Sequence, residues 1–567
     1  MGRPAIFSHG SLDGSSDRRF HIGSGRATFS HSATATTTSH TKAAGNCTSH
    51  PTAHSPPPHP TAQSASRDRP TAGRRDPPTG TGRGAPDALS DHTTHEEVIY
   101  ESLVNISLNN RIGCANVPLM IDRKHLATLR QQEEQLFIDL HPRSAALARD
   151  AHAHLLGGVP MAWMTRWPGS FPLFFEEATG ARFSDVDGRE YVDFCLGDTG
   201  AMTGHALPQV ADALHRQAMR GITTMLPSTD AAWVGAELAR RFTLPVWQMA
   251  MTATDANRFV LRFARHITGR PKVLVFDWCY HGSVDETLVV AGPDGKPQSR
   301  PGSIGPQVDP ALTTVVVPFN DLDALEAALS VGDVACVLAE PALTNIGIVL
   351  PQPGYHEALR SLTRKYGTLL VIDETHTICV GPGGATAAWG LEPDFFVIGK
   401  TIGGGMPAAA YGMTREIAER IMPTLLGESV DVSGVGGTLT GNALALAAVR
   451  ATLSTTLRDD DFAHMIPLAA AWAAGVQSAI DNFGVPWNVQ QLGGRAEYWF
   501  CPPPSDGAAA AAASDHELES FMHLWAVNRG VLLTPFHNMA LMSPHHSQAD
   551  VDLHSQVFHD AVAALLS

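Results

Sequence analysis

The feature that most restricts the fold of this chain is an alternation of apolar, strand-like runs with helical stretches between about residues 200 and 450. The runs are KVLVFD (272–277), TTVVVPF (313–319), ACVLAEP (335–341), LLVIDE (369–374) and FFVIGK (395–400), with helical patterns at 321–330 and 354–367. Continuously apolar strands separated by helices predict an α/β domain with a mostly parallel sheet covered on both faces. In such sheets, functional sites lie at the carboxyl ends of the strands.

The segments on either side of this region differ from it in character. Residues 1–119 are rich in Ser, Thr, His and Pro without a hydrophobic period, which predicts a disordered low-complexity extension. An organellar transit peptide, or a natural start at Met120, are the alternatives for this stretch. We therefore expect four parts: the extension, the N-terminal part of a small domain (120–199), a large α/β domain (200–450) and a C-terminal small α+β domain (451–567).

Local patterns support the two outer folded parts. Residues 122–155 have apolar positions at helical spacing, and Asp187-Gly188 predicts a hairpin turn between two short strands. Helical patterns at 461–482 and 514–530, with a few short strands between and after them, predict the smaller domain.

Composition excludes several classes of function. The formal net charge of -16 argues against a nucleic-acid or anionic-membrane partner, because both require clustered Lys and Arg. We find no apolar run long enough to span a bilayer. The seven cysteines are scattered and include no CxxC pair, which predicts reduced thiols in the cytoplasm and no metal site of that type.

Two charged residues follow buried strands, and their pairing is the most specific chemical signal in the chain. Asp373 ends LLVID, and Lys400 follows FFVIG and precedes the glycines of TIGGGMP. Burial lowers the pKa of a lysine, and the neutral amine is the nucleophile in Schiff-base chemistry. Pyridoxal 5'-phosphate needs such a lysine for its aldehyde and an acid for its pyridine nitrogen. The pair therefore predicts an enzyme that uses this cofactor.

The segment VIDETHTICVGPGGATAAWGLEPDFFVIGKTIGGGMPAAAYG resembles the signature of class III aminotransferases, most closely the glutamate-1-semialdehyde aminomutase-like branch. Other blocks of the family occur in the same order: DVDGREYVDF, MTATDANRFVLRFARHITGR, FDWCYHGSVDE, VPFND, LAEPA and GGTLTGNALALAAVRATL. The resemblance covers roughly residues 120 to 567. It implies the pyridoxal-phosphate-dependent transferase fold type I, with a large, mostly parallel, seven-stranded sheet, and a homodimer whose active site lies at the interface.

The resemblance also implies roles for individual residues. Lys400 would bind the cofactor covalently and then move a proton on the substrate, and Asp373 would pair with the pyridine nitrogen. Tyr280 would stack on the ring, although a core tyrosine is the alternative. Ala253 and Thr254, within TATDA where the family usually has SGTEA, would hold the phosphate at a helix start.

Four further positions follow from the same blocks. Thr438 would reach the phosphate of the neighbouring subunit, and Glu340 would support the site by hydrogen bonding. Thr375 places a hydroxyl where the family's DEV has an apolar group near the ring. His376 would tune the cofactor's protonation near O3′, with a packed structural histidine as the alternative. Asn320 matches a family block, and its role stays open.

Substrate recognition is predicted from the segment GGVPMAWMTRWPGSF and from the C-terminal part. The branch has an arginine here that binds the substrate carboxylate; Met164 occupies that place, and Arg166 is the candidate two positions on, with a surface arginine as the alternative. Trp163 and Trp167 suggest an aromatic-lined pocket. His537 and Asn538 are further polar candidates, in TPFHNM.

Three functions are compatible with these residues. The leading hypothesis is an aminotransferase that moves an amino group between an amino acid and a keto acid or aldehyde. An isomerase, either an aminomutase or an amino-acid racemase, would use the same Lys400 and Asp373. A non-catalytic protein that binds pyridoxal phosphate is the third possibility, because the phosphate loop departs from the family pattern.

Overall fold

The computed structural model describes residues 121–305, 308–428 and 430–567. The sequence predictions for 1–119 lie outside these residues. The described helices are α2 (Arg123–Leu140), α3 (Pro142–His152), α4 (Pro208–Ala218), α5 (Asp230–Phe242), α6 (Ala253–Thr268), α7 (Leu322–Ser330), α8 (Tyr355–Tyr366), α9 (Gly384–Ala388), α10 (Arg415–Leu425), α11 (Ala443–Thr455), α12 (Asp459–Phe483), α13 (Gly507–Ala512), α14 (His516–Asn528) and α15 (Gln548–Leu565).

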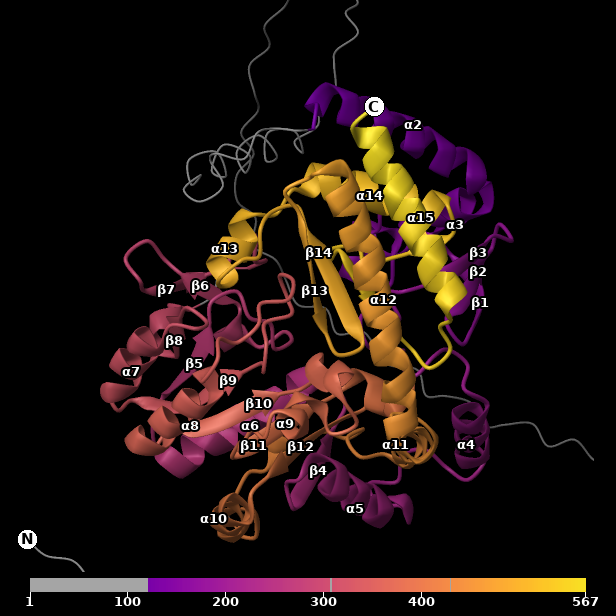
Figure 1. Ribbon diagram of the computed structural model, residues 1–567. Coiled ribbons are helices and arrows are strands. Elements are labelled where there is room, and N and C mark those ends of the chain that lie inside the picture. Colours follow the sequence, from indigo (N-terminus) through magenta and orange to yellow (C-terminus); the bar gives the residue numbers. More distant parts are fainter. Residues whose placement is uncertain (1–120, 306–307, 429) are drawn as a thin grey trace, which may run out of the picture. The chain divides into compact units, whose positions relative to one another are not determined.

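A seven-stranded sheet forms the centre of the large domain (Figure 1). Its strands, in spatial order, are β4 (Val246–Ala250), β12 (Ala409–Met413), β11 (Phe395–Ile398), β10 (Leu369–Asp373), β9 (Val334–Ala339), β5 (Lys272–Phe276) and β8 (Thr314–Val317). The pairings from β11 through β8 are parallel, whereas β12 runs antiparallel to both of its neighbours. The predicted fold class is therefore confirmed, with one strand reversed.

The strands are buried on both faces because helices flank the sheet. β9, β10 and β11 contain only buried residues, which explains their unbroken apolar sequences. β4 is less apolar and β12 is rich in alanine, so neither strand was predicted from its sequence.

Smaller sheets join the two ends of the described chain. β1 (Phe175–Thr179), β2 (Arg182–Asp185) and β3 (Glu190–Asp193) form a sheet that β15 (Val531–Leu532) extends in parallel. β13 (Asn488–Leu492), β14 (Arg495–Trp499) and β16 (Met539–Leu541) form another, and β6 (Val289–Ala291) pairs with β7 (Pro297–Ser299).

The segment 122–155 differs from its prediction. It forms two helices, α2 and α3, because Pro142 has no backbone N–H and starts a new helix after His141. The hairpin at Asp187-Gly188 is confirmed, since Gly188 has a φ of 84° between β2 and β3. Within the described residues, no helix is long and apolar enough to cross a membrane.

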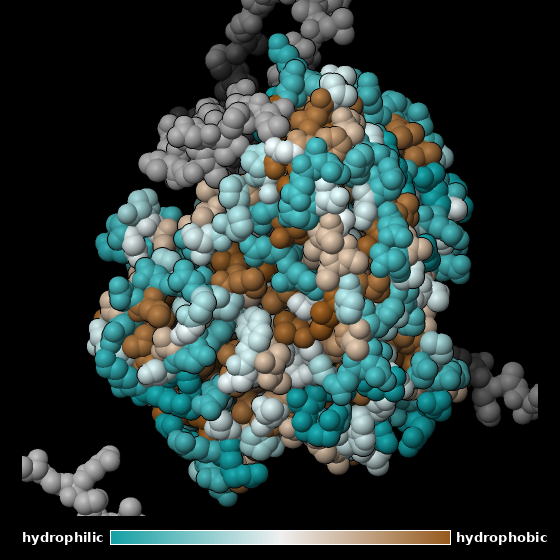
Figure 2. Space-filling view, in the orientation of Figure 1, coloured by the Kyte–Doolittle hydropathy of each residue, from teal (hydrophilic) through white to brown (hydrophobic). Residues whose placement is uncertain are grey.

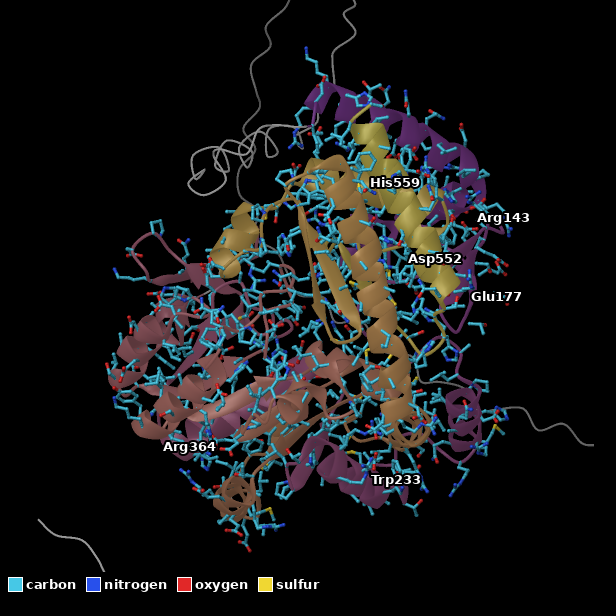
Figure 3. The ribbon with its side chains drawn as sticks, viewed as in Figure 1. Arg143, Glu177, Trp233, Arg364, Asp552 and His559 are labelled. Atoms are coloured by element: carbon cyan, nitrogen blue, oxygen red, sulfur yellow. The ribbon has the colours of Figure 1, made fainter. Side chains whose placement is uncertain are left out.

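Charged and polar residues lie mostly on the outside of these layers. On the face in Figure 2, hydrophilic residues cover the outer helices, and hydrophobic residues gather nearer its centre. The side chains of Arg143, Glu177, Arg364 and Asp552, labelled in Figure 3, are exposed and project outward at the periphery. The two residues with predicted chemical roles lie elsewhere: Asp373 ends the buried strand β10, and Lys400 follows the buried strand β11.

Candidate active site

Lys400 lies immediately beyond β11, in the short 3-10 turn η6 (Lys400–Gly403). Its backbone is left-handed, with a φ of 51°, a conformation that costs a non-glycine residue about 1–2 kcal/mol. Gly399, just before it, is so close to the start of α6 that an added Cβ would lie 3.1 Å from the Cβ of Ala253. The amine-bearing turn and the first turn of α6 are therefore neighbours in space.

The ε-amino group of Lys400 lies between a carboxylate and an imidazole. Nζ donates to Oδ2 of Asp198 at 2.8 Å and lies 2.7 Å from Nε2 of His376. The Nδ1 atom of His376 is 3.1 Å from the hydroxyl of Thr199. His376 is thus part of a polar cluster with Lys400 and Thr199, and its predicted role near O3′ of the cofactor stays a prediction.

The electrostatics of this group agree with its geometry. Burial, followed by the charge of Lys400, lowers the pKa of His376 to about 3, so its imidazole is neutral at pH 7. Burial alone would raise the pKa of Asp198, but the charge of Lys400 and the hydrogen bond from its Nζ hold it well below its usual range. A neutral His376 whose Nε2 accepts from Lys400 carries its hydrogen on Nδ1, from which it can donate to Thr199.

Asp198 was not predicted from the sequence. It lies in a run of left-handed residues, with φ values of 47°, 58°, 51° and 80° at Leu196, Gly197, Asp198 and Thr199. Such backbone is strained and persists only where the surrounding structure enforces it. The available signal was the turn GDTG directly after β3, which carries an acid in a glycine-rich bend.

Asp373 ends β10 and is buried, with 4% of its surface exposed. Oδ2 accepts from Nδ1 of His281 at 2.9 Å and from Nδ2 of Asn257 at 2.8 Å, and Oδ1 accepts from the N–H of Thr375 at 3.1 Å. Burial would raise its pKa, but the bonds and charge of His281, with help from Thr375 and Asn257, lower it to about 2. Asp373 is thus an anion with acceptor capacity left over, since a carboxylate offers about four acceptor positions.

His281 is the cationic partner of this carboxylate. Burial opposes its charge, but Cys279 and Asp373 together raise its pKa well above the usual value. Neither His281 nor Asn257 was assigned a role from the sequence. Asn257 lies one turn into α6, on the side that faces β10.

The start of α6 has the geometry that the predicted anion site requires. The first N–H groups of a helix have no acceptor within it, and Ala253 and Thr254 occupy these positions behind the N-cap Thr252. The Thr254 hydroxyl accepts from the N–H of Ser283 at 3.2 Å. Gly282, with a φ of 81°, must be glycine, because a Cβ would lie 2.0 Å from Oγ1 of Thr254.

Aromatic side chains form one wall near this centre. The rings of Trp163 and Tyr280 are 5.7 Å apart, and that of Phe536 is 5.4 Å from Trp163 in an edge-on arrangement. Trp163 comes from the 3-10 turn η2 (Ala162–Arg166). Trp167 packs instead into a separate core cluster with Phe137.

Glu340 follows β9 and connects to the same wall. Oε1 accepts from the N–H of Tyr280 at 3.4 Å, and Oε2 accepts from the N–H of Thr344 at 3.1 Å. Burial raises the pKa of Glu340. Its predicted supporting role by hydrogen bonding agrees with these contacts. Asn320 lies elsewhere, where its side-chain oxygen accepts from the N–H of Gln352 at 2.9 Å and so holds a loop.

The remaining predicted positions are spread out. Arg166 is exposed, and its charge acts on His516 at the start of α14, so the structure does not bring it together with Lys400. Thr438 is exposed in a groove of about 190 Å³ lined by residues 223–227 and 437–442. His537 is buried, and its Nδ1 lies 3.3 Å from Oε1 of Glu497. Asn538 is also buried, with Oδ1 3.2 Å from Nε2 of His523.

These residues fit pyridoxal phosphate. A lysine amine, an anionic acid with a free acceptor position, a helix N-terminus and a tyrosine ring surround one region. Several buried polar atoms there have no partner among the described residues: Oγ1 of Thr375, Nε2 of His281 and Oδ1 of Asp198. Unsatisfied buried polar groups are costly, so their grouping indicates that a polar ligand belongs between them.

Comparisons with known proteins identify what the chain resembles. The family model for class-III aminotransferases matches residues 163–477. The glutamate-1-semialdehyde 2,1-aminomutase of Desulfitobacterium hafniense is 34% identical over 402 residues, which are 70% of this chain and 92% of the relative. That of Sorangium cellulosum is 36% identical over 434 residues, 75% of this chain and 97% of the relative.

Solved structures include one of higher identity than these two relatives and one of lower identity. A glutamate-1-semialdehyde aminomutase from Pseudomonas aeruginosa PAO1 is 51% identical, with a TM-score of 0.77, covering 79% of this chain and 100% of its own; a variant of it is known in complex with PMP. An omega-transaminase from Sphaerobacter thermophilus is 26% identical, with a TM-score of 0.69, covering 75% of this chain and 98% of its own.

Proposed function

This chain belongs to the class-III aminotransferase family, and we propose that within it the chain is a pyridoxal-phosphate-dependent aminomutase, an isomerase that moves an amino group between adjacent carbons of one molecule. The observation that carries the proposal is the 51% identity to an aminomutase along its whole length. The relatives thus favour the second of the two catalytic hypotheses from the sequence over intermolecular transamination. The substrate class is a small amino aldehyde with a carboxylate, as in glutamate-1-semialdehyde.

Each residue of the site has a task in this reaction. Bound pyridoxal phosphate supplies an electron sink for the negative charge that forms when a proton leaves the carbon bearing nitrogen. Lys400 holds the cofactor and, once its amine is free, is placed to take up and return that proton. Asp373, anionic beside His281, keeps the proton on the pyridine nitrogen.

Asp198 and His376 control the proton on Lys400. Asp198 stabilises the ammonium form of Nζ, and the neutral His376 offers an acceptor on the other side. Ala253 and Thr254 bind the phosphate, and the rings of Tyr280 and Trp163 cover the site and limit the entry of water.

A homodimer is part of the proposal. Large apolar side chains near the Thr438 groove are exposed, among them Met219 at 79%, Met225 at 80% and Leu226 at 72%. Exposed apolar surface of this kind marks interfaces. A second copy that covers it would place Thr438 at the partner's phosphate. A place in the cytoplasm is proposed as well, since Cys195, Cys279, Cys336 and Cys379 are buried and form no disulfide.

The test is isomerisation of glutamate-1-semialdehyde by purified enzyme with no amino acceptor present. We expect turnover to the isomer with nitrogen on the neighbouring carbon, unchanged by added keto acid. The Lys400→Ala variant should lose both turnover and the cofactor's visible absorbance, while keeping its fold by circular dichroism. Turnover that requires a separate keto acid would instead establish a transaminase, the activity of the 26% identical neighbour.

A further inference from the structure

Arg495, the first residue of β14, is a buried arginine with 1% of its surface exposed. Its NH2 nitrogen donates to the carbonyl of Thr344 at 2.9 Å and to Oε2 of Glu497 at 2.8 Å. Burial would lower the pKa of Arg495, but the charge of Glu497 raises it, so the guanidinium stays charged. A full positive charge is therefore held inside the protein.

Most of the donors of this guanidinium are unused. An arginine has five N–H donors, and in the described residues neither Nε nor NH1 of Arg495 has an acceptor, although both are buried. Arg241, another buried arginine, has an acceptor on each of its three nitrogens: Glu237 and the carbonyls of Leu453 and Leu457. Arg189, Arg300 and Arg360 each have a buried Nε without an acceptor, but among the described arginines only Arg495 has two buried nitrogens without one.

The start of β14, which carries Arg495, packs against the turn that follows His376. The N–H of Gly494 donates to the carbonyl of Cys379 at 2.8 Å, which ties the start of β14 to the turn just after His376. The charge of Arg495 lowers the pKa of His376, and the charge of Asp198 raises that of Arg495. The guanidinium is thus electrostatically coupled to both groups that contact the lysine amine.

Glu497 cannot satisfy Arg495 alone. Its Oε2 accepts from NH2, while its Oε1 lies 3.3 Å from Nδ1 of His537. Leaving buried, charged donors unpaired is costly, so an acceptor that arrives from the site would be bound favourably. A carboxylate suits this place, because its hydrogen bonds to arginine are charge-assisted and geometrically specific.

We propose that Arg495 is the binding residue for a carboxylate of the substrate, in place of the exposed Arg166. The carboxylate accepts from NH1 or Nε of Arg495, and the Glu497–His537 contact holds the guanidinium from the opposite side. This proposal rests on the proposed function, since it names the group by which that site selects its substrate. The ligand class is an amino compound that carries a carboxylate at the end remote from its nitrogen.

The test compares two amines of equal carbon number, 4-aminobutyrate and n-butylamine, on the full-length holoenzyme. Each is titrated while the cofactor absorbance is followed, and the ratio of the two dissociation constants measures the preference for a carboxylate. We expect the natural protein to prefer 4-aminobutyrate at least tenfold. In Arg495→Met this preference should fall to about one, with the butylamine constant little changed.

Further variants separate binding from folding. Arg495→Met leaves Glu497 as an unpaired buried charge, so Arg495→Met combined with Glu497→Gln restores charge balance and should show the same loss of preference. Arg495→Lys keeps the positive charge with fewer donors and should retain part of the preference for 4-aminobutyrate. Arg241→Met, the control for loss of a buried arginine, should lower the melting temperature but keep the preference.

Two results would overturn the proposal: a natural enzyme with no preference for 4-aminobutyrate, or a preference that survives in both Arg495→Met variants. Loss of preference in Arg166→Met instead would return the role to that residue. Because the titration needs no turnover, its outcome is independent of whether the enzyme isomerises or transaminates. Failure of the proposed function would appear in the acceptor-free turnover assay alone.

Discussion

Replacing Gly282 by alanine should weaken cofactor binding by a predictable amount. Gly282 adopts a φ of 81° directly after His281, and its missing side chain leaves room for Thr254. A Cβ would lie 2.0 Å from Oγ1 and 2.9 Å from Cβ of Thr254, so that residue would have to move. Thr254 is one of the two residues that we assign to the phosphate.

The magnitude follows from two contributions. A left-handed alanine costs about 1–2 kcal/mol. Displacing Thr254 breaks its hydrogen bond from the N–H of Ser283, which contributes about 0.5–1.5 kcal/mol. The backbone strain lowers the stability of the cofactor-free and cofactor-bound forms alike, so only the displacement of Thr254 weakens the binding of pyridoxal phosphate, by about 0.5–1.5 kcal/mol or roughly 2- to 12-fold.

The assay is a titration of the cofactor-free protein with pyridoxal phosphate, paired with a thermal melt. Gly188→Ala is the matched control, because Gly188 has a φ of 84° but no atom within 4 Å of the position that a Cβ would take, in a hairpin remote from the site. It should lower stability and leave the affinity unchanged. Gly282→Ala with Thr254→Ala should weaken binding less than the two single changes added together, since the second removes the clash. Unchanged affinity in Gly282→Ala would refute the reasoning.

Other consequences can be tested in parallel. Asp373→Asn removes a charge-assisted bond worth about 1.5–3 kcal/mol and should slow turnover roughly 10- to 150-fold with the fold intact by circular dichroism; unchanged kinetics would exclude its role. Thr438→Ala should weaken the binding of pyridoxal phosphate, because we propose that this exposed threonine reaches the phosphate in the partner subunit; a fully active monomer in sedimentation would contradict the shared site. Burial lowers the pKa of His554 to about 3, below the value near 6.5 that it has in the unfolded chain. The unfolded state therefore binds more protons below pH 6.5, and the free energy of unfolding falls by roughly 2 kcal/mol at pH 5. In His554→Phe the fall in melting temperature between pH 7 and 5 should be smaller, and an identical slope would count against this source.

The sequence predicted those parts whose pattern is local. β9, β10 and β11 are apolar throughout because they are buried on both faces, and the charged residues at the ends of β10 and β11 drew attention to Asp373 and Lys400. β12 escaped prediction because its alanines and glycine carry no strand signal, and its direction depends on pairing with β4.

The site residues that escaped prediction are defined by tertiary contacts. Asp198 reaches Lys400 from 202 positions earlier in the chain, through a left-handed turn that no local pattern announces. In the sequence Arg495 resembles any other strand residue, and only the structure shows that two of its nitrogens are buried without an acceptor. Arg166 was chosen by its proximity in sequence to a family position, and its exposed place beside His516 could not be read from that spacing.

The reversed strand β12 has a consequence for how the protein acquires its site. β4, which precedes the phosphate-binding turn, pairs with β12, so that Ala250 lies opposite Ala409 although the rest of the sheet is made from the chain between them. Contacts between distant positions form slowly, because a long loop must close before they are gained. We therefore expect the phosphate-binding end and the lysine turn to come together late in folding, when β4 pairs with β12. We expect the cofactor to accelerate no early step of folding and to bind only after the sheet is complete.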